Sequence, residues 1–483
     1  MKAAMGLLGR DAVVYGLAGG ISRFVKVLLV PVVAKAYPAE TYGVFDALGV
    51  YTYLLAVVGV LGLDSVVVLF AKRRGDRAHD GGSAATLALL LAAATSLVIA
   101  AIAIAGRETW SVVLLGSPAF AAAIAWAGAT IPFSAVLIFS LSLLKWEFRR
   151  RVYLAASLGS VVTSIALTWI VAFHTDYGLA GLFAASMAGQ ALGACVALWG
   201  CRDLFGPVGD NATARRMVGI GVPFVLIAAA GAFTPSIDRF FVVRVHSLEA
   251  AALYGVGQKV AALSALVLSG FQTAWGPFAV GMGEAPNRDR VFGRVLLLVA
   301  VWGVFLAILL SLAGPFLAAT LATKAYAGAG AVVPPLALAT VLTTVYFVVS
   351  IGSFLEGRSL LNLSAYSVGI GVTLALNLVL AARGSSPVAI AWANCAGQAS
   401  AVACMAALSH RVHPIAFPYA AAGVTLMAGA GLAALAARAG RILPFPGLIL
   451  AMLATTTAFG LLTWFAILQP AERRAIQVYR SPG

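Results

Sequence analysis

Residues 83–105 read SAATLALLLAAATSLVIAAIAIA, a run without a single charged side chain. A helix of about 20 apolar residues spans the hydrocarbon core of a bilayer, which is about 30 Å thick. Because no water is present in that core, backbone N–H and C=O groups must bond to one another within the segment. This stretch therefore predicts a transmembrane α-helix, and with it a membrane protein.

Apolar stretches of this kind follow one another along the chain. It has 483 residues, of which 62% are hydrophobic and 10% charged, and its mean hydropathy is +0.99. Since a soluble domain has about 25% charged residues, this composition excludes one. We predict an all-α integral membrane protein with about 14 transmembrane helices, joined by connections too short for a soluble domain. The predicted spans are 12–36, 42–70, 83–105, 119–144, 152–174, 177–200, 217–245, 250–277, 291–313, 330–354, 360–382, 386–408, 416–437 and 446–467.

Basic residues gather in alternate connections between these spans. The segments 72–77 and 145–151 are examples, and such connections hold most of the 32 Lys and Arg residues. Positively charged connections face the cytosol, so we expect both termini there. The same rule accounts for the net charge of +15, and we expect no nucleic-acid partner. The four cysteines show no CxxC spacing, so we expect no zinc site, and nothing in the sequence indicates another metal or a cofactor.

Short sequence matches recur about 210 residues apart. Tyr42-Gly43 returns as Tyr254-Gly255, and the AGQA of 188–191 returns at 396–399. Chance similarity between Ala- and Gly-rich segments is the alternative, but the shared order and spacing favour a duplication. Each copy holds six spans, an even number, so the repeats are parallel and enclose a central cavity. The predicted parts are an N-terminal lobe at 1–208, a C-terminal lobe at 209–412, and two extra spans with a cytosolic tail at 413–483.

Four cations fall inside predicted spans, where a charge costs about 2.5 to 3.5 kcal/mol. They are Arg23, Lys26, Arg239 and Lys259. Arg23 and Lys26 share one face of the first span, and a guanidinium fork beside an ammonium suits a phosphate or diphosphate. We predict that these cations line the cavity and hold an anionic group. For Arg23 and Lys26, the alternative is that they snorkel to the membrane surface or neutralise Asp46 or Asp64 in packing pairs.

Three carboxylates accompany these cations: Asp46, Asp64 and Asp238. Asp46 and Asp64 lie on the second span, where either could pair with Arg23 or Lys26. For Asp238, an interfacial ion pair and a role in ion coupling are equally open. Asp64 lies close to the cytosolic end of its span, which favours a structural role. We expect any coupling to Na⁺ or H⁺ to run through Asp46 or Asp238.

Several of these residues also carry a family resemblance. Ser22-Arg23, Tyr42-Gly43 and Gly62-Leu63-Asp64-Ser65 form one group; Ser236-Ile237-Asp238-Arg239 and Ala375-Leu376-Asn377-Leu378 come later. In these motifs the chain resembles the polysaccharide (O-antigen) flippase branch of the multidrug/oligosaccharidyl-lipid/polysaccharide (MOP) exporter superfamily. The resemblance covers most of the chain, although each motif is short.

The resemblance implies a flippase of the bacterial inner membrane that works by alternating access. Its cargo would be an undecaprenyl-diphosphate-linked oligosaccharide, moved from the cytosolic to the outer leaflet for cell-surface polysaccharide synthesis. Membrane lipids and other polysaccharide-assembly proteins would be its partners. Two alternatives share the fold: a flippase for lipid II-type peptidoglycan precursors, and a cation-coupled multidrug exporter, whose cavity should favour carboxylates. A glycan polymerase or ligase is disfavoured, because the outer connections are short and poor in acidic residues.

Overall fold

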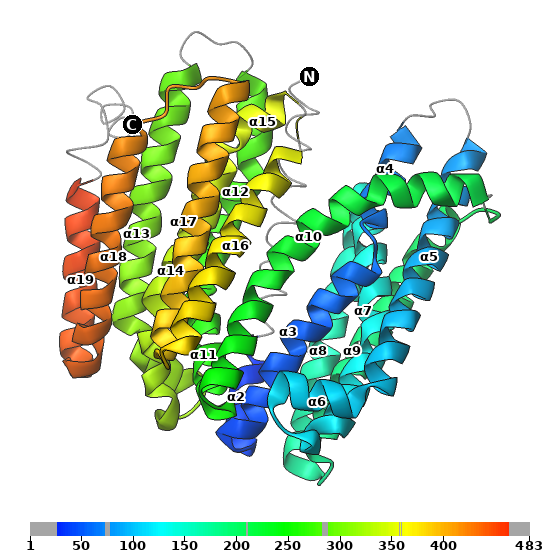
Figure 1. Ribbon diagram of the computed structural model, residues 1–483, viewed down its shortest axis with the longest axis horizontal. Coiled ribbons are helices and arrows are strands. Elements are labelled where there is room, and N and C mark those ends of the chain that lie inside the picture. Colours follow the sequence, from blue (N-terminus) through cyan, green and yellow to red (C-terminus); the bar gives the residue numbers. More distant parts are fainter. Residues whose placement is uncertain are drawn as a thin grey trace, which may run out of the picture.

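The computed structural model describes residues 27–72, 78–208, 211–282, 288–356, 358 and 360–462. Every regular element in these ranges is a helix (Figure 1). The helices are α2 (Leu29–Ala36), α3 (Ala39–Gly59), α4 (Leu63–Lys72), α5 (Ala78–Ala105), α6 (Arg107–Leu115), η1 (Pro118–Phe120), α7 (Ala121–Trp146), α8 (Arg150–His174), α9 (Gly178–Cys201), η2 (Arg202–Leu204), α10 (Asn211–Val245), α11 (Leu248–Ala261), α12 (Leu263–Met282), α13 (Arg288–Leu321), η3 (Lys324–Ala331), α14 (Val333–Val349), α15 (Ile351–Leu355), α16 (Leu360–Ala382), α17 (Pro387–Val412), α18 (Tyr419–Ile442) and α19 (Phe445–Leu462).

The helices form two bundles that lie side by side, with α10 passing from one to the other (Figure 1). We call helices α2 to α9 the first half and α10 to α17 the second half; α18 packs against α13 at the edge of the second half. The connections 202–208 and 413–418 lie at the end that is uppermost in Figure 1, and 246–247 and 383–386 lie at the lower end. The halves meet at the lower end, where α3 packs against α10 and α11. Toward the upper end they diverge, except that the first part of α10 crosses to the first half and packs against α4 and α5.

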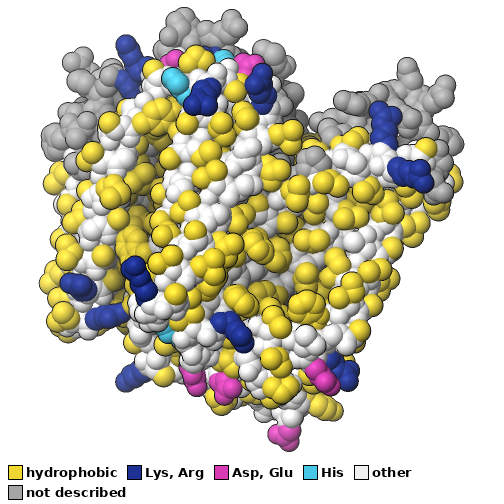
Figure 2. Space-filling view, viewed as in Figure 1, with side chains coloured by type: hydrophobic (Ala, Val, Ile, Leu, Met, Phe, Trp, Pro, Cys, Tyr) yellow, Lys and Arg dark blue, Asp and Glu magenta, His cyan; other side chains and the backbone are white. Residues whose placement is uncertain are grey.

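Hydrophobic side chains cover most of the face seen in Figure 2, and the charged side chains lie toward its two ends. On α5, for example, Leu97, Val98 and Ile102 are all more than half exposed. An apolar surface of this extent would aggregate in water, whereas lipid tails solvate it. The all-α, multi-pass membrane architecture predicted from the sequence is therefore confirmed.

The structure accounts for only part of the predicted number of spans. Among the described residues, 9 helices are long and apolar enough to cross a membrane, or up to 12 if each bent pair counts as one span. The predicted first span falls mostly within residues 1–26, and the predicted last span runs beyond residue 462, both outside the described ranges. Fourteen spans therefore stay a prediction.

The second predicted span of each half contains a break, farther from the repeated tyrosine in the first half than in the second. In the first half, Leu61 and Gly62 adopt positive φ angles of 54° and 65° between α3 and α4. A Cβ atom at Gly62 would lie 2.7 Å from the Gly221 carbonyl oxygen of α10, so glycine permits both the turn and the contact. In the second half, α11 and α12 meet at a 42° bend.

The AGQA repeat marks equivalent helix pairs. A Cβ atom at Gly189 would lie 2.0 Å from Ser164 Oγ, where α9 packs on α8. At Gly397 it would lie 1.9 Å from Thr373 Oγ1, where α17 packs on α16. Each glycine lets its helix approach the preceding one closely, as small residues do in membrane interfaces. These matching contacts are those expected of a duplication, while the lobe boundaries stay a prediction.

Among the described residues, one α-helix lies outside every predicted span. The segment Arg107–Leu115 forms α6 at the lower end, capped by Gly116 in the left-handed conformation. Only Ser111 and Leu115 of this helix are buried. Its charged residues interrupt the apolar pattern, so a search for membrane spans passes over it.

Candidate functional site

Three helices from the two halves meet near the lower end. Asp46 lies in the second turn of α3, Arg239 is on the last part of α10, and Lys259 is near the end of α11. The repeated Tyr-Gly pairs stand at this junction. A Cβ atom at Gly43 would lie 2.0 Å from the Leu248 carbonyl oxygen, and one at Gly255 would lie 2.5 Å from Asp46 Oδ2. The two glycines therefore bring α3 and α11 into close contact and place the three charges side by side.

Asp46 accepts hydrogen bonds from both cations. Arg239 Nε donates to Asp46 Oδ2 at 2.7 Å, and Lys259 Nζ donates to Asp46 Oδ1. Arg239 Nη2 lies 2.7 Å from the same Oδ2 and donates to Gln258 Oε1 at 2.7 Å. Arg239 is fully buried, whereas the Lys259 side chain remains 28% exposed. We call Asp46, Arg239, Gln258 and Lys259 the charge cluster.

Two tyrosines, one from each Tyr-Gly pair, flank the charge cluster. The guanidinium carbon of Arg239 lies 4.9 Å from the centre of the Tyr254 ring, and Lys259 Nζ lies 5.5 Å from that of Tyr42. Such cation–π contacts are worth about 2 kcal/mol or more where water is excluded. The aromatic faces thus help to keep two cations together inside the protein.

A second polar group adjoins the first through Tyr254. The Tyr254 hydroxyl donates to Asp238 Oδ2 at 2.8 Å, and Asn394 Nδ2 donates to the same oxygen at 2.5 Å. Asn377 of α16 lies next to this carboxylate. Asp238 Oδ1 and the side-chain amide of Asn377 are buried and make no hydrogen bond among the described residues. With Asp238 included, two carboxylates balance two cations.

The remaining predicted residues lie elsewhere. Arg23 and Lys26 fall in residues 1–26, outside the described ranges, so their predicted role stays a prediction. Asp64 is in the first turn of α4, beside Ser142 of α7. It therefore does not join the charge cluster. In the part of the chain that the structure describes, no group of three His, Cys, Asp or Glu side chains is placed to hold a metal ion.

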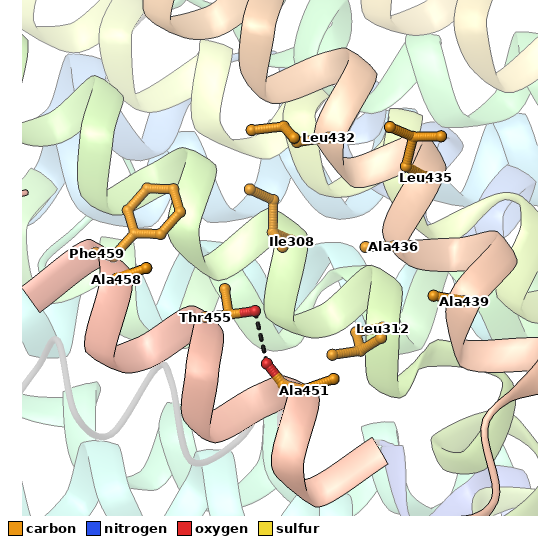
Figure 3. A pocket seen from close by; sticks show the side chains of 10 residues that line it. All are labelled: Ile308, Leu312, Leu432, Leu435, Ala436, Ala439, Ala451, Thr455, Ala458 and Phe459. Atoms are coloured by element: carbon orange, nitrogen blue, oxygen red, sulfur yellow. Dashed lines mark hydrogen bonds between the residues drawn. The ribbon is translucent and has the colours of Figure 1, made fainter. Parts of the chain in front are cut away.

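Two hollows elsewhere in the membrane region are apolar. One, of about 380 Å³, lies between α13, α18 and α19; the Thr455 hydroxyl at its wall donates to the Ala451 carbonyl oxygen at 2.7 Å (Figure 3). The other, of about 460 Å³, lies between α7, α8 and α9, with Trp126 and Tyr177 in its wall. No charged side chain lines either one. Neither hollow is therefore a site for an anionic group, and both face the region where lipid tails lie.

Residues 32–274, about half of the chain, match a protein family described as polysaccharide biosynthesis protein. The chain belongs to this family. The matched range includes Asp46, Asp238, Arg239 and Lys259, so the charge cluster lies within the part shared with the polysaccharide biosynthesis proteins. No curated protein matches the chain in sequence.

Solved structures of similar fold are membrane transporters. The lipid II flippase MurJ in an inward closed conformation matches over 96% of this chain and 100% of its own, with 12% identity and a TM-score of 0.73. An inward-facing multidrug resistance MATE transporter matches over 83% and 94%, with 14% identity and a TM-score of 0.59. A MOP superfamily transporter from Pyrococcus furiosus, described as having a binding pocket of reverse polarity, matches over 84% and 95%, with 15% identity and a TM-score of 0.60. At these identities, what is shared is the transporter fold.

The charge cluster was only partly predictable. Arg239 and Lys259 stand out in the sequence because they are charges within apolar spans, and the prediction for them is that they face an anionic cargo. Pairing with Asp46 is considered from the sequence only for Arg23 and Lys26. In the structure Arg239 and Lys259 both bind Asp46, so pairing is what this conformation contains. Asn377 and Asn394 were missed as site residues. The sequence could have indicated them, because each is an uncharged polar side chain inside an apolar helix.

Proposed function

We propose that this polysaccharide biosynthesis protein is a flippase for an oligosaccharide linked to a polyprenyl diphosphate. The observation that carries the proposal is the charge cluster, in which two cations share one carboxylate at the contact between the two halves. A buried cation is retained where it has a function or a partner. The Lys259 side chain keeps an exposed fraction of 28%, which supports access of an anion to it from outside the cluster.

The same geometry argues against a multidrug exporter for organic cations. Such cargo needs a carboxylate that is free to pair with it, whereas Asp46 already accepts hydrogen bonds from Arg239 and Lys259. Asp238 is fully buried and accepts from Tyr254 and Asn394. Of the charged side chains in the cluster, the one left partly accessible is Lys259, a cation, which suits an anionic cargo.

A lipid II-type precursor is the second candidate, favoured by the fold match to MurJ over nearly the whole chain. It shares the polyprenyl diphosphate, so the charge cluster does not discriminate between the two cargoes. The family match favours a polysaccharide precursor. We therefore place a polysaccharide repeat unit first and make the peptidoglycan precursor an arm of the test.

In the proposed orientation, the upper end faces the cytosol of a bacterium and the membrane is the inner membrane. The basic connections support this arrangement. The junction of α3, α10 and α11 then closes the outward side, and the protein is inward-facing. The diphosphate would bind to Arg23, Lys26, Arg239 and Lys259, the glycan would occupy the space between the halves, and the lipid tail would stay in the bilayer. Rocking of one half against the other would expose the cargo outward.

An ion gradient drives export in this proposal, with Asp238 as the coupling residue. Its Oδ1 is buried and makes no hydrogen bond with any described residue, and a carboxylate oxygen is a ligand for a hard cation or a site for a proton. Neutralising Asp238 would leave Asp46 as the only anion beside Arg239 and Lys259. The excess positive charge would then strengthen binding of the diphosphate, which couples the two sites.

The test is transport by the purified protein in liposomes, followed as the movement of a fluorescent lipid-linked oligosaccharide between leaflets. Lipid II and an organic cation serve as competing cargoes. We expect the double variant Arg23→Ala with Lys26→Ala, and the variant Lys259→Ala, each to slow transport at least about tenfold, since a charge-assisted hydrogen bond is worth about 1.5 to 3 kcal/mol. Arg441→Ala, at an exposed position of the lower end, is the matched control and should keep the wild-type rate.

Three outcomes of this assay would contradict the proposal. Wild-type rates in the cationic variants would remove the diphosphate role, and faster movement of lipid II than of the oligosaccharide would favour the second candidate. For coupling, an imposed Na⁺ or H⁺ gradient should accelerate the wild type and leave Asp238→Asn unaffected. A variant that still responded to the gradient would exclude Asp238.

A further inference from the structure

The contact between the halves at the lower end leaves no free space between backbones. A Cβ atom at Gly43 of α3 would lie 2.0 Å from the Leu248 carbonyl oxygen and 3.3 Å from the Ala252 nitrogen of α11. Packing this close cannot slide by a small amount without a clash, because atoms in a packed interface have few alternative arrangements. We therefore expect the joint to open by separation rather than by gradual sliding.

The charge cluster spans this joint. Asp46 is on α3 of the first half, and its hydrogen-bond donors Arg239 and Lys259 are on α10 and α11 of the second half. A further hydrogen bond across the joint, from Arg244 Nη1 to the Val112 carbonyl oxygen at 3.2 Å, is exposed and has a neutral acceptor. Asp46 therefore makes buried, charge-assisted bonds between the halves, which are the stronger kind.

We propose that Asp46 is a latch that holds the two halves closed at the lower end, and that an anionic group of the cargo opens it by replacing Asp46 on Lys259 and then on Arg239. The latch itself does not depend on the identity of the cargo. The exchange step rests on the proposed function.

Electrostatics explains why an empty carrier stays closed. Separating α3 from α10 and α11 removes the carboxylate from two cations, and an unpaired buried charge costs several kcal/mol. An arriving anion removes that cost by taking the place of the carboxylate. A ligand shifts a conformational equilibrium only by its difference in affinity for the two states, and here that difference comes from the cations that Asp46 leaves.

The two cations differ in how an anion can reach them. Lys259 is partly exposed and would be contacted first, whereas Arg239 is fully buried and becomes accessible once Asp46 withdraws. Gln258, which accepts from Arg239 Nη2, belongs to the same half and stays in place. A diphosphate has two phosphoryl groups, so it can form ion pairs with both cations at once. The single carboxylate of Asp46 can thus be displaced by a group of higher charge.

The duplication supplies a reason for this asymmetry. Asp46 and Gln258 each stand four residues after the tyrosine of a repeated Tyr-Gly pair, and each accepts a hydrogen bond from Arg239. The first half therefore contributes a charged acceptor, and the second half contributes a neutral one at the corresponding position. When the halves separate, only the charged acceptor leaves Arg239.

Spin-label distances across the lower end test the latch. The labels are placed at Glu108→Cys of the first half and Arg383→Cys of the second, both exposed at the lower end, in a variant whose four native cysteines are replaced. Pulsed electron paramagnetic resonance is recorded in lipid nanodiscs. Without ligand, we expect a single short distance in the otherwise wild-type protein. In Asp46→Asn we expect the fraction of molecules at longer distance to rise at least about tenfold, the change produced by 1.4 kcal/mol.

Two further variants separate the latch from general damage. Asp203→Asn removes the ion pair with Arg149, which lies within the first half, and should leave the distance unchanged. Gly255→Ala keeps every charge but directs a methyl group toward Asp46 Oδ2, so it should lengthen the distance as Asp46→Asn does. In Gly270→Ala on α12, the added methyl group meets open space, so this variant should leave the distance unchanged. Unchanged distances in Asp46→Asn and Gly255→Ala would overturn the latch.

The exchange step is tested on the labelled wild type, which needs no destabilising substitution. Undecaprenyl diphosphate in the nanodisc should lengthen the distance, whereas undecaprenol, which lacks the charges, should not. If the diphosphate has no effect while Asp46→Asn does, the latch stands and the exchange is wrong. If the distances behave as expected and liposomes show no glycan transport, the proposed function fails while the latch remains.

Discussion

At the scale of single residues, Arg239 is the largest fully buried side chain among the described residues. It is fully buried and contacts Asp46, Gln258 and the Tyr254 ring at once. This buried guanidinium is tolerated because Nε and Nη2 have acceptors and its charge has a counter-charge, whereas Nη1 makes no hydrogen bond among the described residues. Lys259 depends on the same carboxylate but retains some water contact. Asp46 is therefore the residue on which the stability of the cluster depends.

A double-mutant cycle measures this dependence. Asp46→Ala should lower the free energy of unfolding by about 3 to 5 kcal/mol, because it leaves Arg239 buried without its counter-charge. Adding Arg239→Leu should recover part of the loss, giving a coupling energy of at least about 1 kcal/mol between the two sites. Equilibrium unfolding by SDS in mixed micelles provides the measurement. The same cycle on exposed Arg149 and Asp203 should give a smaller coupling, and strictly additive losses at Asp46 and Arg239 would refute the pairing.

At the scale of helices, glycines decide where the elements meet. Gly43 faces the backbone of α11, whereas Gly49, on the same helix, has open space around it. Glycine costs a helix interior about 0.5 to 1 kcal/mol relative to alanine. That cost is offset at Gly43 by close packing and is not offset at Gly49.

The two positions should therefore respond in opposite directions to the same substitution. Gly43→Ala drives a methyl group into the Leu248 carbonyl and should destabilise the protein by about 1 to 3 kcal/mol, the usual range for overpacking. Gly49→Ala should be neutral or stabilise it by up to about 1 kcal/mol through helix propensity. Thermal unfolding of both variants in detergent makes the comparison. Equal effects at the two sites would mean that α3 and α11 are not in close contact.

At the scale of the whole molecule, the two halves meet at the lower end and diverge toward the upper end, apart from the first part of α10 (Figure 1). Which end faces the cytosol is a prediction from the distribution of basic residues. The orientation decides whether this arrangement is inward-facing, and so on which side of the membrane the latch would open.

Single-cysteine labelling tests that orientation. In a cysteine-free background, Glu108→Cys at the lower end should react with a membrane-impermeant maleimide added to right-side-out vesicles. Arg411→Cys, exposed at the upper end, should react only after the membrane is permeabilised. Both side chains are exposed, so a difference in reactivity reports topology rather than burial. The reverse pattern would invert the proposed orientation, and with it the inward-facing assignment.

Much of this architecture could be predicted from sequence, because crossing a bilayer imposes a strict pattern. Apolar length identified the helices that the structure contains, while α6 was missed because it lies at the membrane edge and carries Arg107 and Glu108. The repeated Tyr-Gly and AGQA motifs identified equivalent positions, since such glycines sit where backbones approach. The polar residues of the site were harder to assemble: Asn377 and Asn394 come from helices far along the chain from Asp238.

The sequence by itself determined that the chain is a bundle of membrane helices, that its halves share motifs, and that Arg239, Lys259 and Asp46 lie within apolar spans. The length of an apolar segment and the presence of a charged residue within it are local properties of the sequence, so they can be recognised before the fold is known. Only the tertiary structure decided that Asp46 joins both cations across the contact between the halves. Hydropathy leaves the rotation of each helix undetermined, and rotation, set by the packing of Gly43 and Gly255, decides which charges meet.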